Sequence, residues 1–428
     1  MTTTINNEHK KLNFSSEREQ SQACLNAAEH EKNQGRKALN VPNLRFKEFE
    51  GEWEKHKLSE ICTFFSGGTP SSSNKDFYGG DMAFIRSGEL HADSTELFIT
   101  KAGFDSSSAK MVEVGDLLLA MYGATSGDIA ISKIEGAINQ AILCIRTNQN
   151  KKFIESVWNK HVSKILRKYL QGGQGNLSAD IVKGISFSFP IIAEQEKLAN
   201  LVSLLDERIA TQNKIIDKLQ SLIKGLNDSL YNQYGNEVLT SFANLGISYS
   251  GLSGKSAQDF GLGKPFITYL NVYSNNVVNE DDFQYVAIKD GEKQNVVEYG
   301  DVLFTLSSET PEEVGIGAVY LGKKEVYLNS FCFGIHITNT EVAFPPYLSY
   351  YVSSTPFRKF VYPYAQGSTR FNLCKVDFEK ASIKLPSLQN QKRIYSILKH
   401  IASKIEIEKN LLGLYNSQKQ YLLHQMFI

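Results

Sequence analysis

Apolar residues at steps of three or four positions mark two long segments of the chain. Such steps place side chains along one face of an α-helix, and that face then packs against a partner. The pattern predicts two helices of roughly 35 residues, each about 50 Å long. The polar members Gln212, Glu408 and Lys419 are expected to weaken the seam locally. The two segments match at a constant offset of 196 and contain Leu198, Leu201, Leu205, Ile209, Gln212, Ile216, Leu219, Ile223, Leu226 and Leu230, then Ile394, Ile397, Ile401, Ile405, Glu408, Leu412, Tyr415, Lys419, Leu422 and Met426.

Four short blocks before the first of these segments recur in the same order before the second. EVGDLLL (113–119) returns as EYGDVLF (298–304), a pattern typical of a Gly-Asp turn entering a buried strand. NQAILCIR from Asn139 returns as NSFCFGIHI from Asn329, QGGQGNL (171–177) as QGSTRFNL (366–373), and FSFP (187–190) as IKLP (383–386). Chance similarity rarely preserves order over four blocks, so the sequence predicts an internal duplication.

The duplication predicts an α+β fold. Two similar globular domains are separated and linked by two long antiparallel helices, with a pseudo-twofold relation between the halves. Residues 1–40 are expected to be an N-terminal arm that is disordered or loosely docked, or else a short marginal helix around Glu17–Lys37. The other expected boundaries are 41–192 for domain one, 193–235 for the central helix, 236–386 for domain two and 387–428 for the C-terminal helix.

Several shorter elements are also predicted inside the domains. The strand candidates are Met82–Arg86, Asp116–Met121, Asp128–Ile131, Phe266–Leu270, Asp301–Leu306 and Gly317–Leu321. The helix candidates are Phe153–Tyr169 and Pro346–Phe360.

Composition restricts the class of protein. The 46 basic and 46 acidic residues balance, which argues against a histone-like basic tail but leaves room for local cationic patches. No apolar run is long enough to span a membrane, and the first residues lack the apolar core of a signal peptide. The wide spacing of the cysteines favours a reducing cytoplasm over a disulfide framework or a zinc site; they are Cys24, Cys62, Cys144, Cys332 and Cys374.

Two segments resemble catalytic or nucleotide-binding motifs, but each lacks a residue that the motif requires. Phe344-Pro345-Pro346-Tyr347 resembles the Asn/Asp-Pro-Pro-Tyr loop of DNA amino-methyltransferases, but Phe344 cannot hydrogen-bond a base amino group. Gly251–Ser256 resembles the end of a P-loop, yet Tyr249 occupies the first glycine position. The scattered histidines form no metal-binding pattern. The sequence therefore predicts a chain that is not an enzyme, with no catalytic residue, metal or cofactor of its own.

Two basic stretches occupy equivalent places in the repeat, and each runs into a QG loop. Residues 158–176 and 357–375 carry four cations each and no acidic residue. Basic side chains neutralise phosphates, and Asn, Gln and Arg read base edges. Together with Gly/Ser-rich loops, they predict a DNA-binding set: Thr69, Ser71, Arg86, Tyr122, Ser126, Lys164, Arg167, Lys168, Gln174, Asn176, Ser253, Lys255, Tyr269, Ser307, Arg358, Lys359, Thr369, Arg370 and Asn372.

With these features in place, residues 41–428 resemble the specificity subunit of a Type I restriction–modification system. The resemblance lies in LRFKEFEGEWEKHKLSEI with SGGTPS, in Phe187–Ile209, in LPSLQNQKRIYSIL from Leu385, and in LSGKS with FGLGKPFITYLNV over 252–272. A Pro-x-x-x-Glu/Asn-Gln entry into a long helix occurs twice, from Pro190 and from Pro386.

The resemblance implies that each globular domain is a target recognition domain that reads half of a bipartite DNA site. The helices would act as a spacer and would dock two methyltransferase (modification) subunits, which use S-adenosylmethionine. Two restriction subunits, translocases and nucleases that use ATP and Mg²⁺, would join the same cytoplasmic assembly on double-stranded DNA.

Two other hypotheses remain open on the residues alone. A stand-alone DNA-modifying enzyme would bind S-adenosylmethionine by itself. A coiled-coil scaffold without a role in DNA binding would account for the helices but not for the two basic stretches.

Overall fold

The computed structural model describes residues 39–169 and 177–428. It contains two compact units: the first holds the described residues up to Glu207 together with Asn416–Ile428, and the second is Arg208–Tyr415. Each of the two long helices is therefore divided between the units, whereas the sequence pattern treats each helix as a separate segment. The predicted arm falls largely on residues 1–38, outside the described residues.

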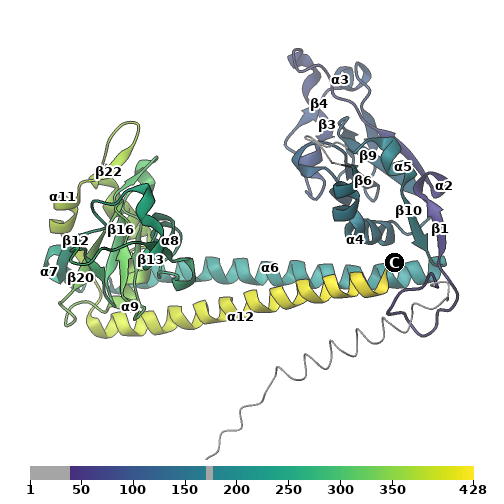
Figure 1. Cartoon of the computed structure of the whole chain (residues 1–428). Coiled ribbons are helices and arrows are strands. Elements are labelled where there is room, and N and C mark those ends of the chain that lie inside the picture. The colour runs from purple at the N-terminus through teal and green to yellow at the C-terminus, as the bar shows by residue number, and fades with distance from the viewer. Residues whose placement is uncertain (1–38, 170–176) are drawn as a thin grey trace, which may run out of the picture. The chain divides into compact units, whose positions relative to one another are not determined.

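The first unit is built on two four-stranded sheets (Figure 1). One is antiparallel and has the order β2-β9-β6-β7, with strands Cys62–Ser66, Ile142–Thr147, Leu117–Ala120 and Ile129–Ile131. The other has the order β4-β3-β8-β5, with strands Phe98–Ile99, Tyr78–Ile85, Gly136–Ile138 and Lys110–Val112, of which β3 and β8 are parallel. A ribbon of β1 (Glu54–Lys57) and β10 (Ser186–Phe189) leads toward the long helix.

Helices complete this unit: α2 (Leu58–Ile61), α3 (Lys101–Asp105), α4 (Lys151–Tyr169) and α5 (Ala179–Gly184), with 3₁₀ turns η2 (Lys75–Phe77), η3 (Ser87–Glu89) and η4 (Gly123–Thr125). The buried Trp158 of α4 donates its indole N–H to the carbonyl of Gly127 at 2.8 Å. Trp158 and Phe153 belong to the core that α4 shares with β6, β7 and β9.

The second unit repeats this topology. Its sheets have the orders β12-β20-β16-β18 and β14-β13-β19-β15, and β11 pairs with β23 as β1 pairs with β10. The strands are β11 (Val238–Thr240), β12 (Gly246–Ser250), β13 (Phe260–Ile267), β14 (Gln284–Val286), β15 (Val296–Val297), β16 (Val302–Thr305), β18 (Gly317–Val319), β19 (Val326–Leu328), β20 (Cys332–Ile337) and β23 (Ile383–Leu385). The same sheet orders confirm two similar domains.

One small sheet is described only in the second unit. It consists of β17 (Ser307–Ser308), β22 (Phe371–Leu373) and β21 (Ala365–Gln366), in the order β17-β22-β21. The helices are α7 (Phe242–Leu245), α8 (Tyr269–Ser274), α9 (Pro345–Tyr351), α10 (Thr355–Val361) and α11 (Lys375–Lys380), with 3₁₀ turns η5 (Ala257–Asp259), η6 (Glu280–Asp282), η7 (Pro311–Glu313) and η8 (Tyr362–Tyr364).

The repeated Gly-Asp block forms the same turn in both units. Gly115 and Gly300 have φ of +92° and +93°, a region that favours glycine. The carboxylate of Asp116 accepts the backbone N–H of Glu113 at 3.1 Å, and Asp301 accepts that of Glu298 at 2.8 Å. The buried strands β6 and β16 follow, so the predicted turn into a buried strand is confirmed twice.

Two predicted elements are wrong in extent. The strand predicted over Phe266–Leu270 ends at Ile267, because the hydroxyl of Thr268 accepts the N–H of Asn271 at 3.1 Å and starts α8. The helix predicted over Pro346–Phe360 is two helices, α9 and α10. Ser354 caps the second, and Pro356, which has no N–H to donate and clashes with the preceding turn, prevents one continuous helix.

The long helices are α6 (Ile192–Tyr234, 43 residues) and α12 (Leu388–Met426, 39 residues), longer than the pattern predicts because each begins before its first heptad position. Along the contacts between the two helices, residue numbers rise in α6 as they fall in α12. In the second unit Arg208 donates to the Tyr415 hydroxyl at 2.7 Å and the Gln212 amide to the Glu408 carbonyl at 3.1 Å. In the first unit Lys419 lies 2.5 Å from Asp206.

Two of the predicted polar seam residues are bonded to each other across the helix pair. Gln212 and Glu408 are buried, and the Gln212 amide also donates to the Glu408 carboxylate. A buried polar pair of this kind fixes register, because a shift of one turn would leave both groups unbonded. At the start of α12, Leu398 is buried while the predicted seam residue Ile397 is 39% exposed, since this end packs on its own domain.

The glutamine of the repeated Pro-x-x-x-Glu/Asn-Gln entry joins each long helix to its domain. Gln195 donates to the Pro190 carbonyl and Gln391 to the Pro386 carbonyl, both at 2.8 Å. Each side-chain oxygen also accepts a backbone N–H from the domain, that of Asn150 at 3.1 Å or of Phe344 at 2.8 Å. Because both glutamines are buried, this motif is a structural joint.

Candidate nucleic-acid interface

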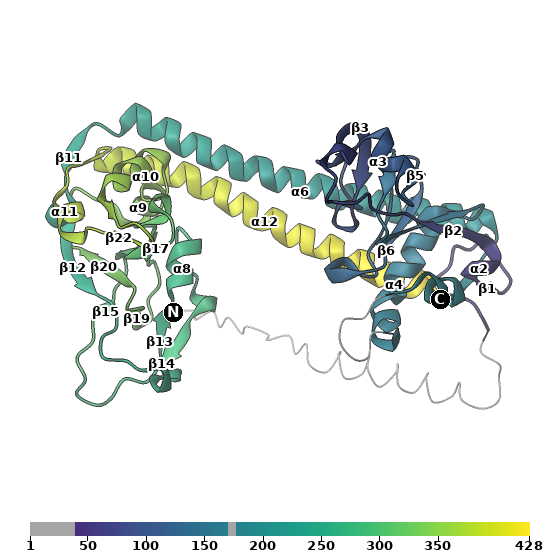
Figure 2. The ribbon, with the colours of Figure 1, turned by 90° about the horizontal axis from the view of Figure 1, so that it is seen from above.

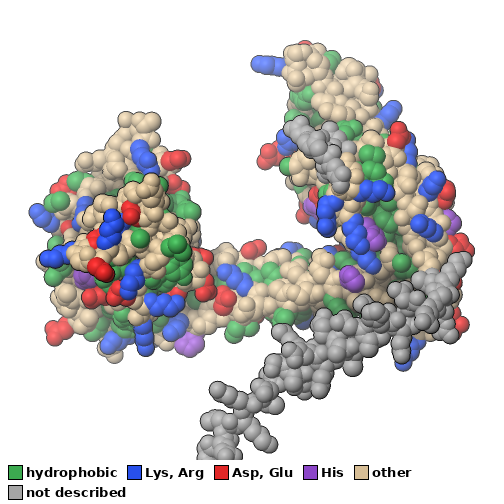
Figure 3. Space-filling view, in the orientation of Figure 1, with side chains coloured by type: hydrophobic (Ala, Val, Ile, Leu, Met, Phe, Trp, Pro, Cys, Tyr) green, Lys and Arg blue, Asp and Glu red, His purple; other side chains and the backbone are tan. Residues whose placement is uncertain are grey.

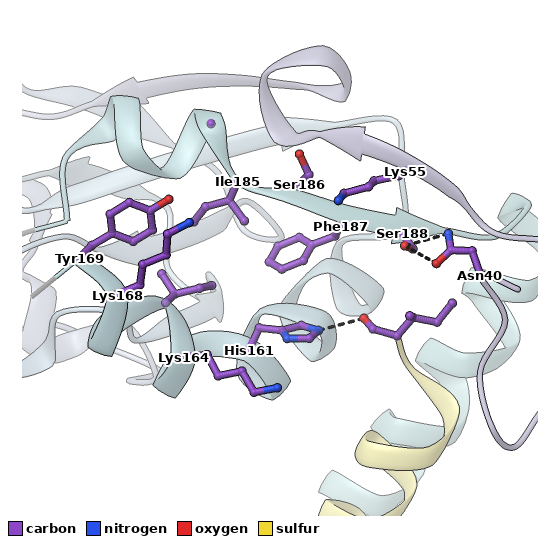
Figure 4. A pocket seen from close by; sticks show the side chains of 13 residues that line it. Asn40, Lys55, His161, Lys164, Lys168, Tyr169, Ile185, Ser186, Phe187 and Ser188 are labelled. Carbon is purple, nitrogen blue, oxygen red and sulfur yellow. Dashed lines mark hydrogen bonds between the residues drawn. The ribbon is translucent and has the colours of Figure 1, made fainter. Parts of the chain in front are cut away.

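The first unit carries a basic groove along the C-terminal half of α4. Lys164 and Lys168 project from α4, Lys55 comes from β1, and the groove encloses about 570 Å³ (Figure 4). Asn40, Ser188 and other polar groups of the β10 side complete the wall. Figure 3 shows Lys and Arg side chains gathered over this part of the first unit. Among the described residues that line the groove, none has an acidic side chain, so it suits a polyanion such as a phosphate backbone.

Two neighbours of this groove are committed to the protein itself. Lys160 donates to the backbone carbonyls of His424, at 3.2 Å, and Phe427. The ring of His161 contacts the carbonyl of Ile428 at 2.9 Å. Burial lowers the pKa of Lys160, and Lys164 lowers it further. Burial also lowers the pKa of His161, although its bond to Ile428 opposes this. The exposed cations in the C-terminal half of α4 are therefore Lys164, Lys168 and Arg167, and of these Arg167 donates to the Ser163 carbonyl at 3.1 Å.

The loops of the first domain hold several predicted residues in local bonds. The Thr69 hydroxyl donates to the Gln140 side chain, Ser71 lies 2.8 Å from Ser73, and Ser126 donates to the Met121 carbonyl at 3.0 Å. Tyr122 precedes η4 and is partly buried. Gln174 and Asn176 lie outside the described residues.

Arg86 is exposed but paired. Its guanidinium donates to both carboxylate oxygens of Glu89, at 2.7 and 3.2 Å, and the hydrogen bond raises the pKa of Arg86. The same bond lowers the pKa of Glu89. Reading a base with Arg86 would require this pair to open, so Arg86 is a weaker candidate for a DNA contact than Lys164 and Lys168.

The second domain gathers three predicted residues, Tyr269, Ser307 and Arg370, around one pocket of about 470 Å³. Figure 2 shows α8 beside β17, where the Tyr269 hydroxyl donates to the Ser307 carbonyl at 2.8 Å. Ser307 in turn pairs with Asn372 across the β17–β22 ladder. Residues 269, 307 and 370 are distant in sequence, and the small sheet brings them together.

Other predicted residues of this domain are occupied or lie apart. Lys255 is buried, 2.5 Å from Glu292, and donates to the Ala287 carbonyl at 2.6 Å. Arg358 donates to the carbonyls of Gly315, Glu312 and Val314 at 2.6 to 2.8 Å, and burial lowers its pKa to about 10. These cations hold loops in place. The backbone of Ser253 is bonded to Gln294, whereas Lys359 and Thr369 are exposed.

Sequence reasoning missed several residues of these two surfaces. Lys55 lines the basic groove, and Tyr273, Glu309 and Phe331 line the pocket of the second domain. Phe331 lies within the repeated Asn block, two positions after Asn329, and is 57% exposed. An exposed phenylalanine inside a repeated block is a feature that the sequence could have drawn attention to. The other three carried no local signal, because only the tertiary fold brings them to a shared surface.

The described residues thus form two copies of one α+β domain, with a basic groove on the first and a mixed polar and aromatic pocket on the second. The family model described as "Type I restriction modification DNA specificity domain" matches residues 50–221 and 254–413. The chain therefore belongs to the family of Type I restriction–modification specificity subunits, which are non-catalytic, and the predicted family, fold class and lack of enzyme activity are confirmed.

Individual relatives agree with the family match. The EcoR124I/EcoR124II specificity subunit of Escherichia coli is 29% identical over 210 residues, so that the match spans 46% of this chain and 50% of that relative. A putative MjaX specificity subunit of Methanocaldococcus jannaschii is 24% identical, and the match covers 87% of this chain and 92% of the relative.

Two solved structures share the fold. A Type I restriction–modification S subunit from M. genitalium has a TM-score of 0.53 at 13% identity, covering 91% of this chain and 99% of that one. A chain from a study of Type I complex assembly has a TM-score of 0.58 at 16% identity, covering 88% and 97%. Among the described helices, none is long and apolar enough to cross a membrane.

Proposed function

We propose that this chain selects the DNA sequence for a Type I restriction–modification complex, each recognition domain reading one half of a bipartite double-stranded site. The observation that carries the proposal is the duplication itself: one domain topology occurs twice, with a basic groove in the first copy and an arginine-bearing pocket in the second. A bipartite, asymmetric site is the natural target of two related but chemically different readers.

The long helices are proposed to set the distance between the half-sites and to dock two methyltransferase subunits. At 1.5 Å per residue, each helix is about 60 Å long, which exceeds one turn of B-DNA. The methyltransferase subunits would supply S-adenosylmethionine chemistry. Two restriction subunits would supply ATP- and Mg²⁺-dependent translocation and cleavage in the cytoplasm. The chain itself would hold no cofactor.

A domain exchange tests this proposal. Residues 41–192 are replaced by the same region of a relative, the complex is expressed with its methyltransferase subunits, and methylated motifs are determined by methylation-sensitive sequencing. One half of the motif should change while the other half and the register remain. A change in both halves or in neither would contradict modular reading, and absence of any methylated motif with the unaltered chain would contradict the function.

A further inference from the structure

The pocket of the second domain has a chemically mixed wall. Tyr269 and Tyr273 come from α8, Ser307 from β17, Glu309 from the following loop, Phe331 from the turn before β20, and Arg370 from the turn that ends at β22. It encloses about 470 Å³. A wall with aromatic rings, one arginine and carboxylates differs from the groove of the first domain, whose charged side chains are lysines, and so suits a different part of DNA.

The walls of this pocket are held rigidly. The rings of Tyr269 and Tyr273 stack at 5.9 Å, and the Tyr273 hydroxyl donates to Glu313 at 2.7 Å. The backbone of Phe331 is tied to Asn329 and Leu306, each at 2.9 Å, although its ring is 57% exposed. An exposed aromatic ring on an anchored backbone is ready to contact a flat apolar group.

Two charged groups in this wall, Arg370 and Glu309, are exposed and have no hydrogen bond or ion pair to another described residue. Glu313, by contrast, accepts bonds from Tyr273 and from Ser308, the latter at 3.0 Å. Arg370 lines the pocket three residues after the turn at Gly367, whose φ is +141°. The pocket thus presents one free guanidinium and one free carboxylate.

The carboxylates decide what Arg370 contacts. A phosphate placed at this guanidinium would lie in a pocket that Glu309 and Glu313 also line, and the like charges would repel one another. A base pair has no net charge and can satisfy both signs. Guanine offers the O6 and N7 acceptors that suit arginine, and cytosine offers the N4 amino donor that suits a carboxylate.

We infer that Arg370 and Glu309 together read one G·C pair in the half-site of the second domain, Arg370 donating to guanine and Glu309 accepting from cytosine. Phe331 then contacts the neighbouring base. This inference rests on the proposed function and goes beyond it by naming one base pair and its readers.

The test uses the complete chain assembled with its methyltransferase subunits. Binding is measured to the cognate duplex and to duplexes in which each base pair of the second half-site is replaced in turn. The variants are Arg370→Ala and Glu309→Ala, and the control is Lys323→Ala, which removes an exposed cation outside the pocket. Because all three side chains are exposed, unfolding midpoints should be unchanged.

Arg370→Ala should weaken cognate binding by about 10- to 100-fold and abolish discrimination at a single G·C position, because one bidentate contact is lost. Glu309→Ala should relax the same position, and Lys323→Ala should leave every position as in the wild type. A half-site without a G·C pair, relaxation at different positions, or a uniform loss on all duplexes, as expected for a phosphate contact, would overturn the inference. Each of these results would leave the proposed function standing, whereas a wild-type complex that prefers no duplex would remove both.

Discussion

The two recognition domains use the same aspartate in the same turn but neutralise it differently. In the first domain Asp116 receives bonds from Arg146, the shortest at 2.7 Å, and Lys151 lies 3.5 Å away. In the second, Asp301 receives bonds from the Tyr249 hydroxyl at 2.6 Å and from His336 at 2.9 Å. The backbone role is shared, while the partner side chains have changed.

This change of partner side chains goes with opposite shifts in the pKa of the two carboxyl groups. Burial favours the neutral form of Asp116, but the bonds from Arg146 and the Glu113 N–H outweigh it and lower the pKa. Burial also acts on Asp301, and there the bonds from Tyr249, Glu298 and His336 do not outweigh it, so its pKa is raised. A duplicated framework therefore tolerates different charges, provided that the turn keeps its acceptor.

The outer surfaces have diverged more than the framework. The first domain has one long helix, α4, with exposed lysines beside the groove. In the second domain the equivalent stretch is broken into α9 and α10, and its Arg358 is turned inward onto backbone carbonyls. The same place in the repeat thus carries exposed positive charge in one domain and supports loop carbonyls in the other.

The largest expected effect tests whether the buried glutamines at the start of the two long helices stabilise their units equally. Gln195→Ala and Gln391→Ala should each lower the free energy of unfolding of their own unit by about 3 kcal/mol, because buried backbone groups lose their partners. Urea unfolding of the full chain measures this, with Gln389→Ala, an exposed neighbour, as the control near zero. A large loss from one variant only would show that the joints differ.

The next effect concerns the aspartate turns. Asp116→Asn should cost about 2 kcal/mol, since Arg146 loses an ionic partner, while Asp301→Asn should cost about 1 kcal/mol, since an amide oxygen still accepts from Tyr249. Chemical unfolding at neutral pH separates the two. Equal costs would contradict the electrostatic difference between the domains.

The stabilisation that each carboxyl group provides, measured as the difference in unfolding free energy between wild type and its Asn variant, should change with pH in opposite directions for Asp116 and Asp301. Because the folded pKa of Asp116 is lowered, its stabilisation is present above the unfolded value of about 3.9 and is lost as pH falls through the folded pKa. Because that of Asp301 is raised, its contribution is greatest below about 3.9 and declines as pH rises through the folded pKa. Unfolding of wild type and variants between about pH 3 and 6 gives the slope of each free-energy difference against pH. Slopes of the same sign would contradict the opposite pKa shifts of Asp116 and Asp301.

The smallest effect concerns the surfaces. Lys164→Ala and Lys168→Ala should each reduce the dependence of DNA binding on salt by about one in log–log slope, with equal loss on all sequences. Arg358→Ala should instead destabilise the second unit, because three carbonyls lose their donor. Titrations of the assembled complex at several salt concentrations, with a melting curve for each variant, distinguish a DNA contact from a structural cation.

Local and periodic features were predictable from the sequence. The long helices, the Gly-Asp turns and the duplication all rest on residues close together or at a constant offset, so their pattern is visible without a fold. Element ends were less accessible: Thr268 as a helix cap and Pro356 as a helix break each depend on one residue that competes with the surrounding periodicity.

The candidate site was predicted only in part, for a physical reason. A cation in the sequence carries no sign of whether it meets solvent or a carbonyl, and so Lys255 and Arg358 entered the predicted set although both are bonded inside the protein. Glu309 and Lys55 were missed because their significance lies in what surrounds them.

The sequence by itself determined that one domain occurs twice, that each copy leads into a long helix, and that the chain belongs to a class of proteins without a catalytic motif of its own. Only the tertiary structure decided which polar groups are free. Hydrogen bonds within the fold occupy Lys255 and Arg358 and leave Lys164, Lys168, Arg370 and Glu309 exposed. Periodicity is a property of neighbours along the chain, whereas the availability of a charge depends on contacts that only folding creates.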